Sequence, residues 1–495
     1  MRHIVHKGKL KDKDPSLVVL FLILAVFLLI GFIGLGKSFL YDWDEGIYAQ
    51  VAQESGFSPS FYWNGQPWLE KPPLIFWLIN FSFLLFGKNE FAARFFMPIL
   101  GALSLVFTHL LIKERLNNKI GLLALTFLLI SPLFLSRSQG LNVDGALLVS
   151  IVASLYFLTR LEKKLVDKKT PSFLDYFFPA LAISLAILAK GIMGFLPALI
   201  WLVYLIFVQG DLLFRSFNVW LVIGLIVIVL VAPWHIYQTI YFGDDFWRVY
   251  LIEHIVKRVY QPIEYHFGGK LYYIKFLISE FSWWLLPIVG GGLLWLISWL
   301  KNKKADKNFI FFLVWGGLVL GLFTFAKTKL FWYILPLYPV LAVLWGYFWQ
   351  RVFFYKKELF FVFILLILSL ALVQKYQSII KSDNPVPSSK IALALEAKKD
   401  CQAPLLFLVD KNERAAADIL PEQLTLSSSF SYGGSPSVVF YFADKVNFFY
   451  RIDQFRTQVE AKEPEVCAMI TQEDYQNIGF ENEVVSRQQE WLLIN

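Results

Sequence analysis

The sequence predicts a polytopic α-helical membrane protein with about 11–13 transmembrane helices, followed by a small C-terminal α/β domain. Three observations support this fold class. Hydrophobic residues make up 57% of the 495 residues and charged residues only 17%, and the mean hydropathy is +0.55. The hydrophobic residues also fall in blocks, most of them long enough to cross a hydrocarbon core of about 30 Å. After Lys381 these blocks give way to short apolar runs that alternate with polar, helix-like segments.

The first apolar block covers residues 16–36. It is longer than the core of a signal peptide and ends in GLGKSFLYDW rather than in a small-residue cleavage site, so we expect a retained helix. Ten further blocks bring the predicted number of membrane spans to eleven. These ten blocks are residues 91–112, 120–136, 143–159, 176–189, 192–208, 218–239, 277–300, 309–325, 330–349 and 359–373.

One block, PLIFWLINFSFLLFG at residues 73–87, is short for a span, and counting it would invert every later loop. The basic loops decide between the two topologies. If the block lies in the membrane interface, all basic segments share one side, which the positive-inside rule makes cytoplasmic. These segments are MRHIVHKGKLKDK, KERLNNK, RLEKKLVDKK, KNKKADK and RVFFYKK. Because these basic residues lie between apolar blocks, the net charge of +8 does not indicate nucleic-acid binding.

This topology divides the chain into two domains. We expect a transmembrane domain at residues 1–380, with outer loops 37–90 and 240–276, and a C-terminal α/β domain at residues 381–495. After eleven spans the second domain lies outside a multi-pass protein of the cell (cytoplasmic) membrane. Both cysteines, Cys401 and Cys467, lie in this domain, and the sequence is compatible with a disulfide or with two free buried thiols.

The same topology gathers polar residues on the outer side. They include Asp44, Asp144, Lys190, the loop 240–275 and the KTK segment at 327–329. Polar groups at membrane depth are expensive and are usually retained for a function, so the collection predicts an outward-facing active site. For each residue alone, a solvated loop charge is the alternative.

Two segments supply the candidate functional residues near the first span. In DWDEGIYAQVAQESG, Asp44 and Glu45 begin a short amphipathic helix, where capping is the structural alternative, and we assign only that role to Asp42. In WLEKPPL, Glu70 and Lys71 precede a stiff double proline at the membrane surface. There Lys71 can pair with a lipid phosphate, or serve as an ordinary interfacial lysine.

Several ordered motifs resemble a known family. DEGIYA, EKPPLIFWL, FAARF, LNVDGAL, LAKGIMGFLPAL, EHIVKR and KTKLFWYILPLYP follow one another over roughly residues 39–339. Their order resembles the GT-C class of lipid-linked-sugar transferases, which includes the aminoarabinose transferases acting on lipid A and the protein O-mannosyltransferases. The C-terminal domain resembles this family in position and size.

The resemblance implies a GT-C fold, a polyprenyl-phosphate sugar donor and a glycolipid, glycan or protein acceptor on the outer face. It implies that Asp44 is the catalytic carboxylate and that Lys71 binds the lipid phosphate. It also implies a divalent metal ion near Glu70 and His254, although two protein ligands are an incomplete set.

The chemistry gives roles to the remaining residues. Transfer from a sugar phosphodiester requires stabilisation of the departing phosphate, for which Lys71, Arg258, Lys327 and Lys329 are the candidates. Asp44 takes the proton of an acceptor hydroxyl, Glu45 supports it, and a single displacement predicts inversion at the anomeric carbon. Asp144 orients the acceptor or a basic partner, or only stabilises a helix N-terminus. Tyr333 lies about one turn beyond Lys329 and is a candidate substrate contact.

The sequence allows two alternatives to a transferase. A transporter or flippase for a lipid-linked sugar is the main alternative, and Lys190 favours it because it interrupts two short apolar runs. We see no internal repeat of the kind that many transporters contain. A mere membrane anchor for the C-terminal domain leaves eleven spans without a purpose. Lipid A, other cell-envelope glycans and secreted proteins all stay open as acceptors.

Overall fold

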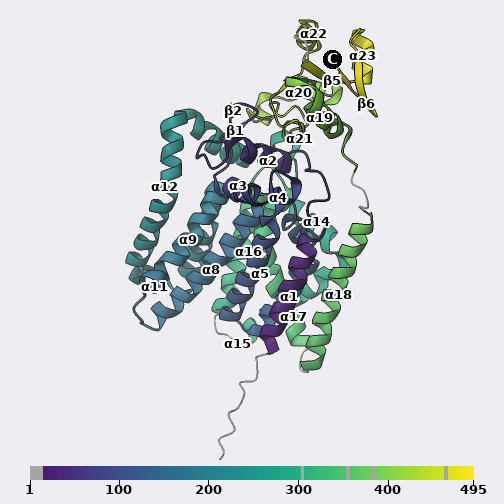
Figure 1. Ribbon diagram of the computed structural model, residues 1–495. Helices are drawn as coiled ribbons and strands as arrows, with labels where there is room; N and C mark the ends of the chain where they lie inside the picture. Colours follow the sequence, from purple (N-terminus) through teal and green to yellow (C-terminus); the bar gives the residue numbers. More distant parts are fainter. Residues whose placement is uncertain (1–14, 303–305, 353–356, 382–385, 462–465) are drawn as a thin grey trace, which may run out of the picture.

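The computed structural model describes residues 15–302, 306–352, 357–381, 386–461 and 466–495. The basic N-terminal segment and parts of KNKKADK, RVFFYKK and the linker after Lys381 lie outside the described residues. Figure 1 shows a bundle of long helices with short helices and a small sheet domain at one end. We call this end of the bundle the domain end.

The predicted helical membrane fold is confirmed. Within the described residues, eight helical segments are long and apolar enough to cross a membrane, and three apolar helices are shorter. This is fewer than the eleven predicted spans, because two predicted spans are shorter than a full crossing and two others form one segment that reverses direction. The helices that match the predicted blocks are α1 (Pro15–Phe32), α5 (Phe96–Arg115), α6 (Asn118–Ile130), α8 (Asp144–Val166), α9 (Phe173–Lys190), α10 (Leu196–Val208), α12 (Phe217–Trp247), α15 (Leu285–Asn302), α16 (Lys307–Phe325), α17 (Tyr338–Val352) and α18 (Lys357–Lys381).

The reversal between α9 and α10 depends on two glycines. Gly191 has a φ of +57°, a conformation that L-residues rarely adopt, and it ends α9 directly after Lys190. Gly194 packs so tightly against the end of α9 that a Cβ atom there would lie 2.2 Å from the backbone nitrogen of Ile187. The turn therefore holds Lys190 at the domain end while α10 returns along the bundle.

The opposite end of the bundle carries an ion-pair network. Arg115 at the end of α5 lies 2.7 Å from Glu162 of α8, and Tyr204 of α10 donates to the same carboxylate. Lys163 pairs with Glu114 beside them. The basic segments KERLNNK and RLEKKLVDKK thus share one end, opposite the domain end. Which side of the membrane this end faces stays a prediction.

The ambiguous block forms helix α3 (Leu74–Phe86), which starts and finishes at the domain end (Figure 1). Just before it, Lys71 contacts His254. Just after it, Glu90, the first residue of α4 (Glu90–Arg94), accepts a hydrogen bond of 2.9 Å from Tyr441 of the C-terminal domain. Both ends of α3 therefore lie at the same end of the bundle, and the helix does not cross it.

The C-terminal domain contains the predicted α/β sheet. Its strand order is β4-β3-β5-β7-β6, with β3 parallel to β4 and β5 and with β7 antiparallel to β5 and β6. Leu405 to Leu408 of β3 are buried on both faces, as a central parallel strand requires. The strands are β3 (Gln402–Leu408), β4 (Val446–Phe449), β5 (Val466–Thr471), β6 (Val484–Gln488) and β7 (Trp491–Ile494), and the helices are α19 (Ser389–Asp400), α20 (Lys411–Ile419), α21 (Ser437–Phe442), α22 (Ile452–Glu460) and α23 (Gln472–Ile478).

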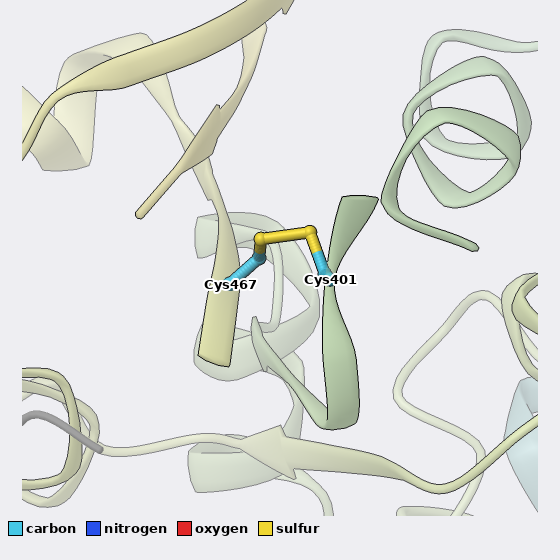
Figure 2. The surroundings of a disulfide bond; sticks show 2 residues. All are labelled: Cys401 and Cys467. Atoms are coloured by element: carbon cyan, nitrogen blue, oxygen red, sulfur yellow. A yellow bond between two sulfur atoms is a disulfide. The ribbon is translucent and has the colours of Figure 1, made fainter. Parts of the chain in front are cut away.

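A disulfide bond links Cys401 and Cys467, as Figure 2 shows. Cys401 directly precedes β3, and Cys467 lies on the neighbouring strand β5. This selects the disulfide over the two free thiols that the sequence also allowed.

Specific contacts join the domain to the bundle. The Asn64–Gly65 turn between β1 (Tyr62–Trp63) and β2 (Gln66–Pro67) has positive φ at both residues, as a tight hairpin requires. The Asn64 side chain exchanges two hydrogen bonds with the backbone of Val446 and so covers the edge of β4. Asp42 accepts a hydrogen bond from the Ser437 backbone, which gives this carboxylate a docking role.

Candidate active site

A cavity of about 1010 Å³ lies at the domain end, between the helix bundle and the C-terminal domain. The start of α2 (Asp44–Ser55), the facing ends of α8 and α9, and residues 250–266 line it from the bundle side. The turn η5 (Phe331–Leu337) adds a further wall, and residues 413–432 of the C-terminal domain close the cavity from the other side. Most of the predicted site residues line this cavity.

Asp44 is the first residue of α2 and projects into the cavity, with 44% of its side chain exposed. Its Oδ2 atom lies 3.9 Å from Nη1 of Arg137. Removal from bulk solvent raises the pKa of Asp44, while the charge of Arg137 opposes this shift. The preceding residue, Trp43, has a φ of 71°, and its ring packs against Tyr432 of the C-terminal domain. Asp44 is therefore an incompletely paired carboxylate that faces the cavity from a constrained helix start.

Glu45, by contrast, has its carboxylate fully engaged. Both oxygens accept hydrogen bonds from Arg94, at 2.9 and 2.5 Å. The backbone amides of Leu141 and Tyr41 donate to the same two oxygens, at 2.7 and 2.9 Å. Arg94 belongs to the FAARF motif, and Leu141 lies in the loop before α8. Glu45 therefore connects this motif to that loop. The arrangement suits a support for Asp44 rather than a proton acceptor.

Asp144, the first residue of α8, lies beside Asp44 and is paired with two cations. Its carboxylate accepts a hydrogen bond from Lys190 at the end of α9, and Nη1 of Arg137 is 4.0 Å away. Arg137 ends the short helix α7 (Pro132–Arg137), and its guanidinium stacks 4.3 Å from the centroid of the Trp332 ring. Arg137 thus stands between the two carboxylates.

Two of the predicted phosphate ligands, Lys71 and Arg258, form a basic cluster with Lys190 in the cavity. Nζ of Lys71 lies 3.2 Å from Nδ1 of His254, and burial lowers the pKa of Lys71 to about 8, against the opposing effect of Glu70. Arg258 lies 3.9 Å from Glu264, and both Arg258 and Tyr333 line the cavity. Nζ of Lys190 lies 5.1 Å from the centroid of the Tyr333 ring. This part of the cavity presents three cations and a phenol, a set suited to a phosphate group.

Two predicted phosphate ligands are not brought into the cavity, and this corrects the sequence-based interpretation. Lys329 donates to the carbonyl oxygens of Phe323, Thr324 and Ala326, at 2.7, 2.7 and 2.5 Å, and so caps the C-terminus of α16. Its ammonium group has no donor left for a substrate. Lys327 has an exposed side chain that does not line the cavity.

Glu70 and His254 lie together, as the metal interpretation requires, with His254 Nε2 3.5 Å from Glu70 Oε2. In this arrangement the pair does not fit a metal ion. The Lys71 ammonium approaches Nδ1 of His254 as a donor, which places the imidazole proton on Nε2, the atom that faces Glu70. Among the described residues, no group of three His, Cys, Asp or Glu side chains could hold a metal. We therefore use no metal in the mechanism.

The C-terminal domain contributes residues that no sequence motif indicated. The Tyr432 hydroxyl donates to Oε1 of Glu70 at 2.6 Å and accepts from Trp68 Nε1 at 2.8 Å. Ser429 donates to Glu264 at 2.8 Å. Arg137 was also missed, although it lies in the same polar loop as Asp144, seven residues earlier. Ser429 is 165 positions and Tyr432 at least 362 positions from their partners in the chain, so no spacing pattern indicated them.

Comparisons with known proteins agree with this geometry. The family model described as dolichyl-phosphate-mannose-protein mannosyltransferase matches residues 70–237. A protein of Aquifex aeolicus is 30% identical over 319 residues, which cover 62% of this chain and 67% of that protein. The undecaprenyl phosphate-alpha-4-amino-4-deoxy-L-arabinose arabinosyl transferase 1 of Pseudomonas fluorescens is 28% identical over 66% of this chain and 58% of its own length.

The fold has a solved counterpart. The crystal structure of ArnT from Cupriavidus metallidurans bound to undecaprenyl phosphate superposes with a TM-score of 0.68, covering 97% of this chain and 98% of ArnT at 16% identity. The chain therefore has the same fold as ArnT. Among the curated relatives the matched segment spans 55–67% of their length, so it leaves part of each relative unmatched. The cavity lies at the junction of the helix bundle and the C-terminal domain.

Proposed function

We propose that the protein transfers a sugar from a polyprenyl-phosphate donor to an acceptor in this cavity, on the extracytoplasmic face of the membrane. The single observation that carries the proposal is the cavity itself, in which an incompletely paired carboxylate, Asp44, faces a basic cluster of Lys71, Arg258 and Lys190. The relatives named for undecaprenyl-phosphate-linked aminoarabinose support the donor class.

The basic cluster supplies the leaving-group chemistry. Cleavage of the bond between the anomeric carbon and the phosphate oxygen leaves growing negative charge on the polyprenyl phosphate. Lys71 and Arg258 would bind these oxygens, and Tyr333 lines the cavity with them as a further polar contact. Because the groups are already positioned, little reorganisation accompanies the reaction.

Asp44 supplies the base. An acceptor hydroxyl placed behind the anomeric carbon would pass its proton to Asp44 as its oxygen bonds to that carbon. Arg137 keeps a cation near Asp44 and so favours the charged carboxylate. Asp144, paired with Lys190, would orient the arginine. A single displacement inverts the configuration at the anomeric carbon.

A transporter or flippase is the rival function, and Lys190 was the residue that favoured it. The structure pairs Lys190 with Asp144 at the domain end, where it lines the cavity. Reconstituted full-length protein with a radiolabelled polyprenyl-phosphate sugar separates the two functions. Transfer of label to an acceptor supports the transferase, and movement of intact donor across the bilayer without transfer contradicts it.

A metal ion at Glu70 and His254 stays a prediction for the donor-bound protein. Binding of the donor phosphate to Lys71 would free Nδ1 of His254 to carry the imidazole proton, so that Nε2, which faces Glu70, could bind a metal ion. Metal analysis of the purified protein with and without polyprenyl phosphate tests it, with Glu70→Gln as the control. Bound metal that depends on both donor and Glu70 would support the prediction, and a protein without bound metal in both states contradicts it.

A further inference from the structure

The wall of the cavity that adjoins the basic cluster, where Glu264 lies 3.9 Å from Arg258, has a distinct chemistry. We call it the acceptor wall and define it by Glu264, Tyr265, Glu413, Ser428, Ser429 and Phe430. We infer that the acceptor is a neutral carbohydrate hydroxyl held at this wall, and that acceptors carrying a phosphate at the reacting position are disfavoured. This inference rests on the proposed transferase function and names the substrate class of the same site.

The position of the donor decides where the acceptor binds. The polyprenyl chain belongs in the hydrocarbon along the bundle, and its phosphate belongs at Lys71 and Arg258 on the bundle side of the cavity. Inversion requires the acceptor to approach the anomeric carbon from the side opposite the phosphate. The remaining side of the cavity is closed by residues 413–432. The acceptor therefore meets the acceptor wall.

The charge of this wall is negative. Glu413 and Glu264 are its ionisable side chains, and among the described residues no lysine or arginine of the C-terminal domain lines the cavity. The basic residues of α20 pair elsewhere, Arg414 with Asp474 at 2.8 Å and Lys411 with Glu473 at 2.7 Å. Glu264 has Arg258 of the basic cluster 3.9 Å away, so Glu413 is the carboxylate of this wall without a counter-charge in the part of the chain that the structure describes, and a phosphate at the wall would face it.

Besides Arg258, two other basic groups lie near the wall, and neither offers a cation to a phosphate bound there. Lys257 approaches residues 425–432 from outside the cavity and donates to the Thr425 carbonyl oxygen. His266 lines the cavity, and its Nδ1 atom lies 3.0 Å from the carbonyl oxygen of Ile263, so Nδ1 donates there and Nε2 is left as a hydrogen-bond acceptor. A sugar hydroxyl can donate to such acceptors, whereas a phosphate cannot.

Glu413 is available to a ligand. None of the ion pairs among the described residues includes Glu413, and the residue is exposed. Gly434, with a φ of +65°, packs against it so closely that a Cβ atom there would lie 3.0 Å from Cγ of Glu413. The Ser429 hydroxyl already donates to Glu264 and accepts from the Leu426 amide, so Ser428 supplies the hydroxyl that can donate or accept. Together these groups match the hydroxyls of a sugar, and the Phe430 and Tyr265 rings offer apolar faces.

A peptide acceptor fits this wall less well. Extended peptides commonly bind by adding a strand to a free sheet edge. Here the edge of β4 is covered by Asn64, and residues 426–431 use backbone groups in turns of their own, such as Ser431 N to Ser428 O at 3.0 Å. The wall therefore offers side-chain groups rather than a backbone ladder.

The step balances without another reactant. The acceptor oxygen bonds to the anomeric carbon, the bond from that carbon to the phosphate oxygen breaks, and its electron pair leaves with the polyprenyl phosphate. The hydroxyl proton passes to Asp44.

The test uses the full chain in proteoliposomes and measures release of polyprenyl phosphate with three acceptors. These are a neutral glycolipid, the same glycolipid with a phosphate at the acceptor position, and a peptide rich in serine and threonine. We expect kcat/KM for the neutral glycolipid to exceed that for the other two at least tenfold. Glu413→Lys should reduce the ratio of kcat/KM for the neutral glycolipid to kcat/KM for the phosphorylated glycolipid severalfold. Glu413→Gln should reduce this ratio less.

Glu473→Gln is the matched control, because it removes a carboxylate of the same domain that pairs with Lys411 away from the cavity. It should leave the acceptor preference unchanged. Equal or better use of the phosphorylated glycolipid or of the peptide by the unaltered protein overturns the inference alone. Failure of all acceptors to release polyprenyl phosphate, with donor that stays intact, overturns the proposed function and the inference with it.

Discussion

The hydroxyl of Tyr432 in the C-terminal domain donates a 2.6 Å hydrogen bond to Oε1 of Glu70 in the EKPP motif of the bundle. The two residues are 362 positions apart, and Glu70 directly precedes the lysine that we assign to the donor phosphate. The geometry of the donor site thus depends on the docking of the second domain.

Tyr432→Phe should therefore weaken catalysis through the donor site. A hydrogen bond to a charged group contributes about 1.5–3 kcal/mol, so we expect kcat/KM for the donor to fall roughly tenfold or more. Tyr475→Phe is the control, because that hydroxyl bonds the Asn482 carbonyl within the C-terminal domain. An equal loss of activity in both variants would show that only domain stability matters.

Asp44→Asn should insert normally and lose at least a hundredfold of transfer to a hydroxyl acceptor, because an amide can still occupy the helix start but cannot accept the proton. Glu45→Gln should have an intermediate effect, since it weakens the Arg94 contacts, and Asp42→Asn should have a mild one. Steady-state transfer assays rank the three variants. Near-normal transfer by Asp44→Asn would make this carboxylate structural.

The acid limb of the pH profile should report Asp44. Because burial raises the pKa of this carboxyl, the base becomes protonated, and transfer falls, at a pH above the usual range of an aspartate. Arg137→Gln removes the main charge that opposes the shift, so the acid limb should move to higher pH. Profiles of kcat/KM against pH for both proteins provide the measurement, and an unmoved limb contradicts the assignment of Asp44 as the base.

Lys71→Ala should weaken donor binding by roughly ten- to a hundredfold, from the loss of a charge-assisted contact of about 1.5–3 kcal/mol. Lys327→Ala should not, because that side chain is exposed and does not line the cavity. Binding of polyprenyl phosphate to the purified variants measures both effects. If Lys71→Ala binds the donor normally, Lys71 is only an interfacial anchor.

The topology prediction can be tested on intact cells. An impermeant amine label should reach lysines of the C-terminal domain and spare the Lys163–Lys169 loop, which lies at the opposite end of the bundle. The reverse labelling pattern would place the cavity on the cytoplasmic face.

The sequence predicted the helices well because membrane crossing imposes a long apolar block on each of them. Charge alone was sufficient to place α3 at the domain end, where its flanking residues Lys71 and Glu90 contact other parts of that end. The order of the motifs was also sufficient to gather Asp44, Lys71, Asp144 and Arg258 in one group, which the structure brings to one cavity.

Side-chain direction was the part that the sequence did not determine. The KTK segment shows two lysines near the cavity, but only the fold shows that Lys329 turns back to cap α16. Contacts across the two domains, such as those of Tyr432, depend on docking between distant segments and have no local periodicity.

Residues of both domains form the cavity. The bundle supplies the carboxylate and the basic cluster, and the sheet domain supplies the facing wall, which is joined through a linker and pinned by Asn64, Asp42 and Tyr441. Recombination at the linker would thus exchange the facing wall of the cavity and keep the carboxylate and the basic cluster of the bundle. Such an exchange would change the wall that faces the acceptor and keep the residues that we assign to the donor.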